Sequence, residues 1–354
     1  MNQNQAKQDA TLVKSVRALM GLLSVVLVSL ALMVVTLFIG PAQIANWFNP
    51  ITPVTKMDST VVNDPWQAPD VSSLPNDETG NEIRYGRELI AHTADYLGPQ
   101  GKVMAISNGM NCQNCHLDAG TKPFGNNYSA VASTYPKFRA RSGTAETIEK
   151  RVNDCIERSL NGHALADDSH EMKAMVSYIK WLGARVPKGE TPKGAGLVEL
   201  TYLNTSADSA KGKMLYAEKC VVCHGKNGEG IKHPDSTSWT NPPLWGKDSY
   251  NDGAGLFRLS RFAGYIKANM PLGATYLEPQ LSDEEAWNIA AYVNSLPRPT
   301  KDLSNDWPDI SKKPIDHPFG PYADGFDEAQ HKYGPFLPII ETRKQLTKTQ
   351  ANIP

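Results

Sequence analysis

Four of the five cysteines occur as two pairs, and each pair is followed directly by a histidine. The two motifs are Cys112-Gln113-Asn114-Cys115-His116 and Cys220-Val221-Val222-Cys223-His224. In a C-x-x-C-H pattern both thiols form thioethers to one porphyrin edge, and the following imidazole binds the iron. A redox dithiol or half of a zinc site is the competing interpretation, but no further C-x-x-C pair completes a four-cysteine zinc site. Two copies therefore predict two covalently bound haem c groups, with His116 and His224 as proximal ligands.

The second haem needs a ligand on its other face. Met270 lies in the sequence Met270-Pro271-Leu272-Gly273, in a predicted loop before the last helix of that domain. Ligation by histidine and methionine raises the potential of a haem and suits electron transfer. Two other residues could bind the iron instead, namely His233 and Lys267. The sequence favours Met270.

The first haem has no comparable Met-Pro loop, and the fifth cysteine, Cys155, stands alone in a predicted helix over 145–160. Helical spacing brings Arg151, Arg158 and Ser159 to positions next to it. A lone cysteine is equally often a small buried hydrophobic residue. Three further residues could serve as the distal ligand of this haem: His170, Met172 and Met175.

These residues must be positioned by helices, because each haem motif lies between helical patterns and little of the sequence resembles strand. The predicted helices span 82–97 and 168–182 around the first motif and 210–218 before the second, which is followed by a closing helix that includes Trp287 and Val293. Asp168-x-x-Glu171 and Ser282-x-x-Glu285 are typical of capping boxes that begin the two closing helices. We therefore expect an all-α fold with two tandem cytochrome c domains.

The N-terminal region predicts a membrane anchor. Residues 18–39 carry no charge and are mostly apolar, and a helix of that length covers about 33 Å, close to the ~30 Å hydrocarbon core of a bilayer. Lys7, Lys14 and Arg17 precede this run and the next cation is Lys56. The excess of positive charge places the N-terminus in the cytoplasm and the haem domains in the periplasm, anchored in a bacterial inner membrane by a single span. A cleaved signal peptide is the alternative.

Composition gives the remaining boundaries. Stretches rich in Pro, Gly and Lys or in Pro, Asp, Ser and Thr are typical of linkers. The predicted segments are a cytoplasmic N-terminus (1–17), an anchor (18–39), a tether (40–79), a first cytochrome c domain (80–186), a linker (187–206), a second domain (207–298) and an extended Pro-rich C-terminal arm (299–354). The 36 basic and 37 acidic residues nearly cancel, so the charge does not indicate nucleic-acid binding.

Several strings resemble the diheme thiosulfate dehydrogenase (tetrathionate synthase) family, from about Gly80 to the C-terminus. They are NCQNCHLDAGTKPFGN from Asn111, YPKFRAR from Tyr135, RVNDCIERSLNG from Arg151, PPLWG from Pro242, NMPLG from Asn269 and DHPFGPY from Asp316. The second-domain strings occur in many c-type cytochromes, whereas the surroundings of Cys155 are specific.

The resemblance implies that two thiosulfate ions and tetrathionate are interconverted with two electrons at the first haem. Cys155 would then be the distal ligand at rest and the nucleophile that holds a sulfur fragment during turnover. Both substrates are dianions, and arginine forks bind sulfonate oxygens well. The predicted catalytic residues are Lys122, Arg139, Arg141, Arg151, Cys155, Arg158 and Ser159. A cytochrome c, an oxidase or a quinone-linked protein would exchange the electrons.

Two other functional classes remain open from the sequence. A membrane-anchored diheme carrier, such as a terminal-oxidase subunit, would use histidine and methionine at both irons and would need no substrate site. A diheme peroxidase would need an openable coordination position. In the resembling family a lysine can precede the methionine and compete for the iron, but here that residue is Asn269, which predicts a fixed Met270 ligand.

Overall fold

The computed structural model describes residues 17, 19–24, 26–27, 29–30, 33, 64–234 and 237–351. The chain divides into two compact units, Met1–Val62 and Asn63–Pro354. The described residues of the first unit are helical and carry exposed apolar side chains such as Leu22 and Leu23. Within the described residues, no helix is long and apolar enough to cross a membrane. Most of the predicted anchor, 18–39, lies outside them.

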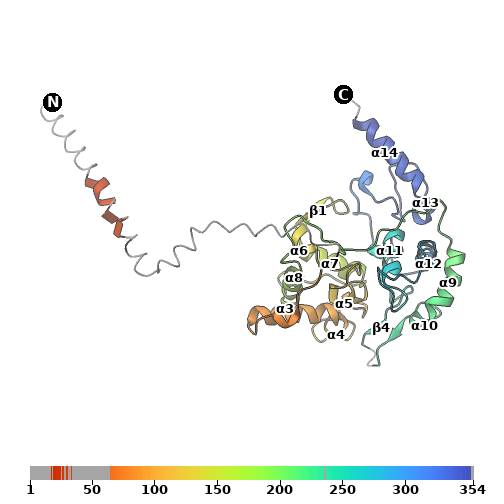
Figure 1. Cartoon of the computed structure of the whole chain (residues 1–354), viewed down its shortest axis with the longest axis horizontal. Helices are drawn as coiled ribbons and strands as arrows, with labels where there is room; N and C mark the ends of the chain where they lie inside the picture. Colours follow the sequence, from red (N-terminus) through yellow and green to blue (C-terminus); the bar gives the residue numbers. More distant parts are fainter. Residues whose placement is uncertain are drawn as a thin grey trace. The chain divides into compact units, whose positions relative to one another are not determined.

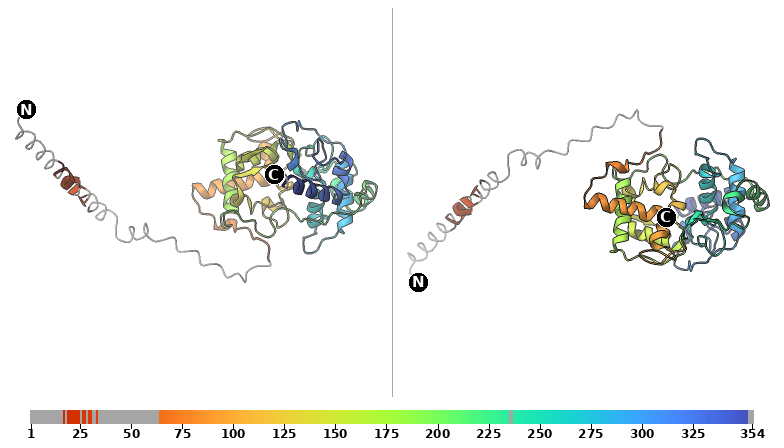
Figure 2. Two further views of the ribbon diagram at one scale, coloured as in Figure 1. Left: turned by 90° about the horizontal axis from the view of Figure 1, so that it is seen from above. Right: turned by 90° about the horizontal axis from the view of Figure 1, so that it is seen from below.

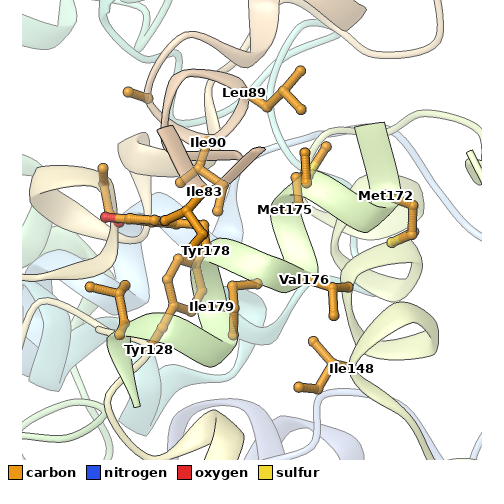
Figure 3. Close-up of a cluster of buried hydrophobic side chains, with 14 of the residues drawn as sticks. Ile83, Leu89, Ile90, Tyr128, Ile148, Met172, Met175, Val176, Tyr178 and Ile179 are labelled. Atoms are coloured by element: carbon orange, nitrogen blue, oxygen red, sulfur yellow. The ribbon is translucent and has the colours of Figure 1, made fainter. Parts of the chain in front are cut away.

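The second unit begins with a group of mostly helical elements around the first haem motif (Figure 1). In chain order they are η1 (Val71–Ser73), α3 (Glu78–Ala91), α4 (Thr93–Leu97), η2 (Cys112–Asn114), α5 (Leu117–Gly120), α6 (Val131–Thr134), β1 (Lys137–Arg139), β2 (Thr144–Glu146), α7 (Ile148–Arg158) and α8 (His170–Leu182). The helix before the motif, α3, packs against the closing helix, α8. Figure 3 shows Tyr178 and Ile179 of α8 beside Ile83 of α3 in the core between them.

The second motif repeats this plan, as predicted. Its elements are α9 (Ser209–Lys219), α10 (Val221–His224), β3 (Ile231–Lys232), β4 (Trp239–Asn241), η3 (Gly255–Phe257), α11 (Leu259–Asn269) and α12 (Asp283–Ser295). Helix α12 packs against both α9 and α11 around a second core. Figure 2 shows the two helical groups side by side within the second unit.

A glycine permits the closest helix contact in each group. A Cβ atom on Gly86 of α3 would lie 1.9 Å from the backbone oxygen of Ala174 in α8. A Cβ atom on Gly212 of α9 would likewise lie 1.9 Å from the backbone oxygen of Asn288 in α12. Because backbone atoms cannot yield to such an overlap, only glycine fits at either crossing. The repeated contact shows that the two groups are built on the same helix pair.

The helix boundaries differ from the predictions in two places and agree in a third. The predicted helix over 82–97 is divided at His92, whose φ and ψ of −125° and 41° are not helical. Ser169, and not Asp168, caps α8 by accepting a hydrogen bond from the N–H of Met172. The capping box of Ser282 and Glu285 at the start of α12 is confirmed.

Two short hairpins were not expected from the sequence. Strand β1 pairs with β2, and β3 pairs with β4, both antiparallel. Strand β2 takes the first residues of the predicted helix over 145–160, so that α7 begins at Ile148 after the capping residue Thr147. Strands of two or three residues are too short for a period of two to be recognised in the sequence.

Hydrogen bonds hold the end of the predicted tether and the predicted linker. The N–H of Trp66 bonds the carbonyl of Lys193 at 2.9 Å, so the ordered unit already includes the end of the 40–79 segment. The N–H of Phe124 bonds the carbonyl of Gly194, and Trp287 Nε1 bonds the carbonyl of Thr201. The 187–206 segment is therefore attached to both groups.

The C-terminal arm was predicted to be extended, but it contains three helical elements. They are η4 (Ile310–Lys312), α13 (Glu328–Tyr333) and α14 (Leu337–Ala351). Phe336 and Ile339 are buried in the second core. His331 is also buried, and its two ring nitrogens contact the carbonyl of Ile315 and the carboxylate of Asp324. The aromatic and aliphatic residues of the arm thus complete the second group.

Asp316 of the arm closes the start of α11, the helix that ends next to Met270. Its carboxylate is 1% exposed and accepts hydrogen bonds from Arg258 Nε at 2.9 Å and from the N–H of Ser260 at 3.0 Å. Burial opposes its ionisation, but Arg258 and Ser260 outweigh burial and lower the pKa of Asp316.

We expect Asp316→Asn to reduce the free energy of unfolding by about 3 kcal/mol, because it leaves Arg258 without its buried partner. Because the pKa of Asp316 is lower in the folded protein than in the unfolded chain, its carboxylate stabilises the fold at any pH above the unfolded pKa of about 3.9. This stabilisation is lost as the pH falls through the pKa of Asp316 in the folded protein. Urea denaturation followed by circular dichroism measures both effects. The exposed Glu341 on α14 provides the control Glu341→Gln. Equal losses in the two variants would contradict the assignment.

Candidate haem sites and their surroundings

A cavity of about 680 Å³ contains the predicted attachment site of the second haem. Cys220, Cys223, His224 and Met270 all line it, together with apolar side chains of the second core. This volume lies within the range of about 300–1,000 Å³ that is usual for cofactor sites. The structure thus brings together all four residues predicted to hold the second haem.

Both motif histidines are oriented through one ring nitrogen. His224 Nδ1 lies 2.9 Å from the carbonyl oxygen of Pro242, and His116 Nδ1 lies 2.5 Å from that of Asn126. A carbonyl can only accept, so Nδ1 carries the proton and Nε2 is left for the iron. Burial lowers the pKa of His224, which favours the neutral, metal-binding form. The histidines therefore have the tautomer that iron ligation requires.

The neighbours of Met270 are held away from the iron site. Lys267 Nζ donates to the carbonyl of Leu281 at 2.6 Å and pairs with Asp283 at 2.7 Å. Asn269 is buried, and its amide nitrogen donates to the carbonyl of Phe124 at 3.0 Å. Neither side chain is free to replace the methionine. His233, the other alternative, also lines the cavity.

Cys155 lies in the last turns of α7 and differs chemically from the motif cysteines. Burial raises the pKa of Cys112 to about 11 and that of Cys115 to about 12. Burial opposes ionisation of Cys155 as well, but the charge of Arg151 and the proximity of His116 lower its pKa to about 6. Since His116 Nδ1 is bonded to Asn126, Nε2 is the nitrogen left to face Cys155. The structure therefore places Cys155 beside the proximal histidine, with a thiol that ionises more readily than the motif thiols.

The alternative ligands of the first haem are engaged elsewhere. Met172 and Met175 are fully buried in the first core, where α8 packs on α3. The ring of His170 stacks on Tyr85 with centroids 4.9 Å apart. These positions fit packing better than ligation, and Cys155 remains the predicted distal ligand.

Two of the predicted cations, Arg151 and Arg141, act on Cys155, and Arg139 lies on the neighbouring hairpin. Arg151 lies one helical turn before it, and the proximity of the Cys155 thiolate raises the pKa of Arg151. Arg141 Nη2 pairs with Asp154 at 2.5 Å, and Arg139 Nε lies 3.8 Å from the carboxylate of Glu146. Arg151 has no ion pair within 4 Å among the described residues. It is therefore the guanidinium best placed to meet an anion.

Arg158 does not fit its predicted role as a substrate ligand. It is 8% exposed, and its two terminal nitrogens bond both carboxylate oxygens of Asp306 at 2.8 Å. Nη1 also donates to the carbonyl of Gly253 at 3.4 Å. A guanidinium engaged in a bidentate pair has little capacity left for a second anion. Arg158 joins α7 to the second domain and the arm.

For two predicted substrate-binding residues, Ser159 and Lys122, the described residues give no contact that bears on substrate binding. Ser159 follows α7, and its N–H bonds the carbonyl of Cys155 at 2.7 Å. Lys122 is half-buried in the loop after the first motif, and its ammonium makes no ion pair with the described residues. Their contacts with substrate remain predictions.

Two acidic residues of this site were missed in the sequence. Glu146 is 1% exposed on β2, and its carboxylate accepts no hydrogen bond from the described residues. Asp154 precedes Cys155 and bonds Lys150 at 3.0 Å as well as Arg141. Both carboxylates reduce the positive charge around Cys155. The sequence offered no signal for Glu146, because the hairpin that buries it was not expected.

The two haem sites adjoin each other. Cys115 of the first motif lines the same cavity as Cys223 of the second. Tyr265 of α11 donates a hydrogen bond to the carbonyl of Asn114, within the first motif, at 2.8 Å. The residues present at both motifs fit covalently bound haem.

Comparison with known families agrees with this geometry. The SoxA/TsdA cytochrome c domain family matches residues 102–187, and the cytochrome c family matches residues 209–297. The Marichromatium purpuratum thiosulfate dehydrogenase TsdBA, in its "as isolated" form, is a similar solved structure, with a TM-score of 0.60 and 32% identity. The match covers 66% of this chain and 50% of that chain.

Curated relatives extend the comparison. Thiosulfate dehydrogenase of Psychrobacter arcticus is 42% identical over 68% of this chain and 71% of its own length. Thiosulfate dehydrogenase of Allochromatium vinosum is 39% identical over 65% of this chain and 83% of its own. The chain belongs to the thiosulfate dehydrogenase family and carries two covalently bound haem c groups, one at each C-x-x-C-H motif.

Proposed function

We propose that this protein interconverts thiosulfate and tetrathionate at its first haem and passes the electrons to its second. The observation that carries the proposal is the Cys155 thiolate, which faces His116 and lies beside the unpaired Arg151. An electron carrier that binds no substrate would not need a cationic pocket around a thiolate ligand. The names of the curated relatives support the same reaction.

The residues of the chain account for binding and for the sulfur chemistry. Arg151, with Arg141 behind it, holds the sulfonate of thiosulfate so that the outer sulfur meets Cys155. The outer sulfur and the Cys155 sulfur form a bond, and two electrons leave, which gives an S-thiosulfonate on Cys155 (Cys155–S–S–SO3−). The outer sulfur of a second thiosulfate attacks the substrate sulfur that is bonded to Cys155, the bond to Cys155 breaks, and tetrathionate and the Cys155 thiolate are released. When bound, the two haem c groups supply the two one-electron acceptors.

The pairing of Arg141 with Asp154 limits the positive charge of this pocket. A dianion enters more readily when the surrounding cations are in excess, but a large excess would also retain the dianionic product. Glu146 and Asp154 keep the balance between binding and release. The reaction can thus run in both directions.

A diheme carrier without its own substrate is the less favoured alternative. Such a protein would have methionine opposite both histidines, whereas the first site has Cys155. Met270 gives the second haem the ligand of an electron-transfer site. The physiological partner, a cytochrome c, an oxidase or a quinone-linked protein, would exchange electrons there.

We also propose that residues 18–39 anchor the protein in a bacterial inner membrane with the haem domains in the periplasm. The uncharged run and its cationic N-terminal flank support this location. The described leucines of this segment are exposed, as lipid-facing residues would be.

Cys155→Ala is expected to abolish thiosulfate oxidation and tetrathionate reduction while both haems stay attached. The alanine keeps the helix but removes the only sulfur that can hold the substrate fragment. Activity with separate artificial electron acceptors and donors, together with haem content from absorbance, measures the outcome. Glu149→Gln, on the first turn of the same helix, should retain activity. Appreciable turnover by Cys155→Ala would refute the proposal.

Met270 should bind the second iron in both redox states, because Lys267 and Asn269 are held by other partners. The far-red sulfur-to-iron charge-transfer band of oxidised protein reports this ligand. We expect the band in the wild type and in Lys267→Gln and its loss in Met270→Gly. A wild type without the band, or a Met270→Gly variant with it, would show that another residue ligates.

Full-length protein is expected to remain with membranes after a high-salt wash, whereas a chain beginning at Asp64 should be released. The apolar run, and not surface charge, would hold the protein, so salt should not detach it. Immunoblotting of the washed fractions measures this. A soluble mature form that begins near residue 46 would show instead that the segment is a cleaved signal.

A further inference from the structure

Tyr265 of α11 extends from the cavity of the second haem to the motif of the first. Its side chain is 5% exposed and lines the cavity that also contains Cys220, Cys223 and Met270. Its hydroxyl donates a hydrogen bond to the carbonyl oxygen of Asn114 at 2.8 Å. Asn114 lies between the two cysteines of the first motif. One side chain therefore contacts both haem sites.

The carbonyl that accepts this hydrogen bond is directly connected to the attachment of the first haem. The carbonyl carbon of Asn114 is bonded to the backbone nitrogen of Cys115, and the Cys115 sulfur forms one of the two thioethers. A continuous route therefore runs from the first porphyrin through Cys115 and Asn114 to the hydroxyl of Tyr265. Within this route the hydrogen bond is the only link that is not covalent.

The hydroxyl of Tyr265 is held as a hydrogen-bond donor. Burial raises the pKa of Tyr265 well above its usual value. A carbonyl oxygen can only accept, so the proton of this bond belongs to the phenol. Helix α11 is fixed at its start by Asp316, which accepts a hydrogen bond from the N–H of Ser260. The ring is therefore presented to the first motif by an anchored helix.

Other hydrogen bonds that join the two helical groups end away from the first motif. Asn269 donates to the carbonyl of Phe124, and Asn108 donates to the carbonyl of Asp248. Among the described residues, Tyr265 makes the one hydrogen bond from the second group that ends between the motif cysteines. Its position therefore differs from that of a general contact between the groups.

We propose that Tyr265 is the bridge through which electrons pass between the two haems. In each transfer the first iron loses one electron and becomes ferric, and the second iron gains that electron and becomes ferrous. No bond forms or breaks, and the phenol keeps its proton. The proposal rests on the electron transfer between haems that the proposed function includes, and not on thiosulfate as the substrate.

The hydrogen bond matters because electron tunnelling slows steeply at each gap between atoms that are not covalently bonded. The two oxygens are 2.8 Å apart, whereas atoms in van der Waals contact are about 3.5 to 4.0 Å apart. Removing the hydroxyl alone would lengthen this gap while the ring stays in the cavity wall. The transfer should then slow without a change in the potential of either haem.

The test follows one electron in the full-length protein with both haems bound and without thiosulfate. Laser-flash photoreduction delivers less than one electron per molecule, and absorbance is followed at wavelengths where the two haems differ. The transfer from the first haem to the second is the phase whose rate does not depend on protein concentration. In Tyr265→Phe we expect this rate to fall several-fold. Spectroelectrochemical titration should show unchanged midpoint potentials, so that driving force does not explain the difference.

Tyr178→Phe is the matched control. Tyr178 is fully buried, and its hydroxyl donates to the carbonyl of Ala119 at 3.0 Å, shortly after the first motif. It belongs to α8 in the first helical group, and it is not among the described residues that line the second cavity. Its loss removes the same kind of hydrogen bond without touching the bridge, so the transfer rate should not change.

Replacement of Tyr265 by 4-fluorophenylalanine is the second variant, for the case that Tyr265→Phe does not retain both haems. The fluorine fills the space of the hydroxyl but cannot donate, so the transfer should slow here as well. An unchanged rate in either Tyr265 variant, or an equal slowing in Tyr178→Phe, would overturn the proposal. A wild type that does not act on thiosulfate would contradict the proposed function instead, because the electron-transfer measurement contains no substrate.

Discussion

The C-terminal end of α7 is fixed by the buried ion pair between Arg158 and Asp306, and the position of Cys155 depends on it. Asn251 adds a second attachment, because its amide donates to the carbonyl of Glu157 at 2.8 Å and to Asn161 Oδ1 at 3.0 Å. At the other end, Thr147 caps the helix. A thiolate can stay opposite His116 only if its helix neither slides nor rotates. The second domain and the arm are therefore part of the first haem site.

The same elements bring the two haem sites together. Helix α11 touches the first motif through Tyr265, touches Phe124 through Asn269, and ends next to Met270. A single helix thus contacts the surroundings of one haem and positions the proposed ligand of the other. Asp316 holds the start of this helix, so the arm fixes both the catalytic and the electron-transfer sites. This arrangement suits an enzyme that must pass two electrons, one at a time, between fixed centres.

Much of the site could be predicted from the sequence because its signals are local. The C-x-x-C-H motifs, Met270 before Pro271 and the capping box at Ser282 each occupy a few consecutive residues. Contacts between distant residues left no such signal. The partner of Arg158 lies in the arm at Asp306, and this pairing turned a predicted substrate ligand into a structural link.

The same reason explains the other differences. The hairpin that buries Glu146 is made of strands too short to show an alternation of polar and apolar residues. Asp168 and Ser169 are both residue types that cap helices, so the sequence does not show which of the two caps α8. In the sequence, Gly86 and Gly212 cannot be distinguished from other helical glycines. Only the helix crossings show why glycine is required at these two positions.

The central claim is that the first iron lies between His116 and the Cys155 thiolate while the second lies between His224 and Met270. Electron paramagnetic resonance of the fully oxidised protein tests it most directly, because the two ligand sets give distinct low-spin ferric signals. The account predicts one histidine–thiolate signal and one histidine–methionine signal, with only the first lost in Cys155→Ser. Two histidine–methionine signals, or a spectrum that the Cys155→Ser substitution leaves unchanged, would contradict it.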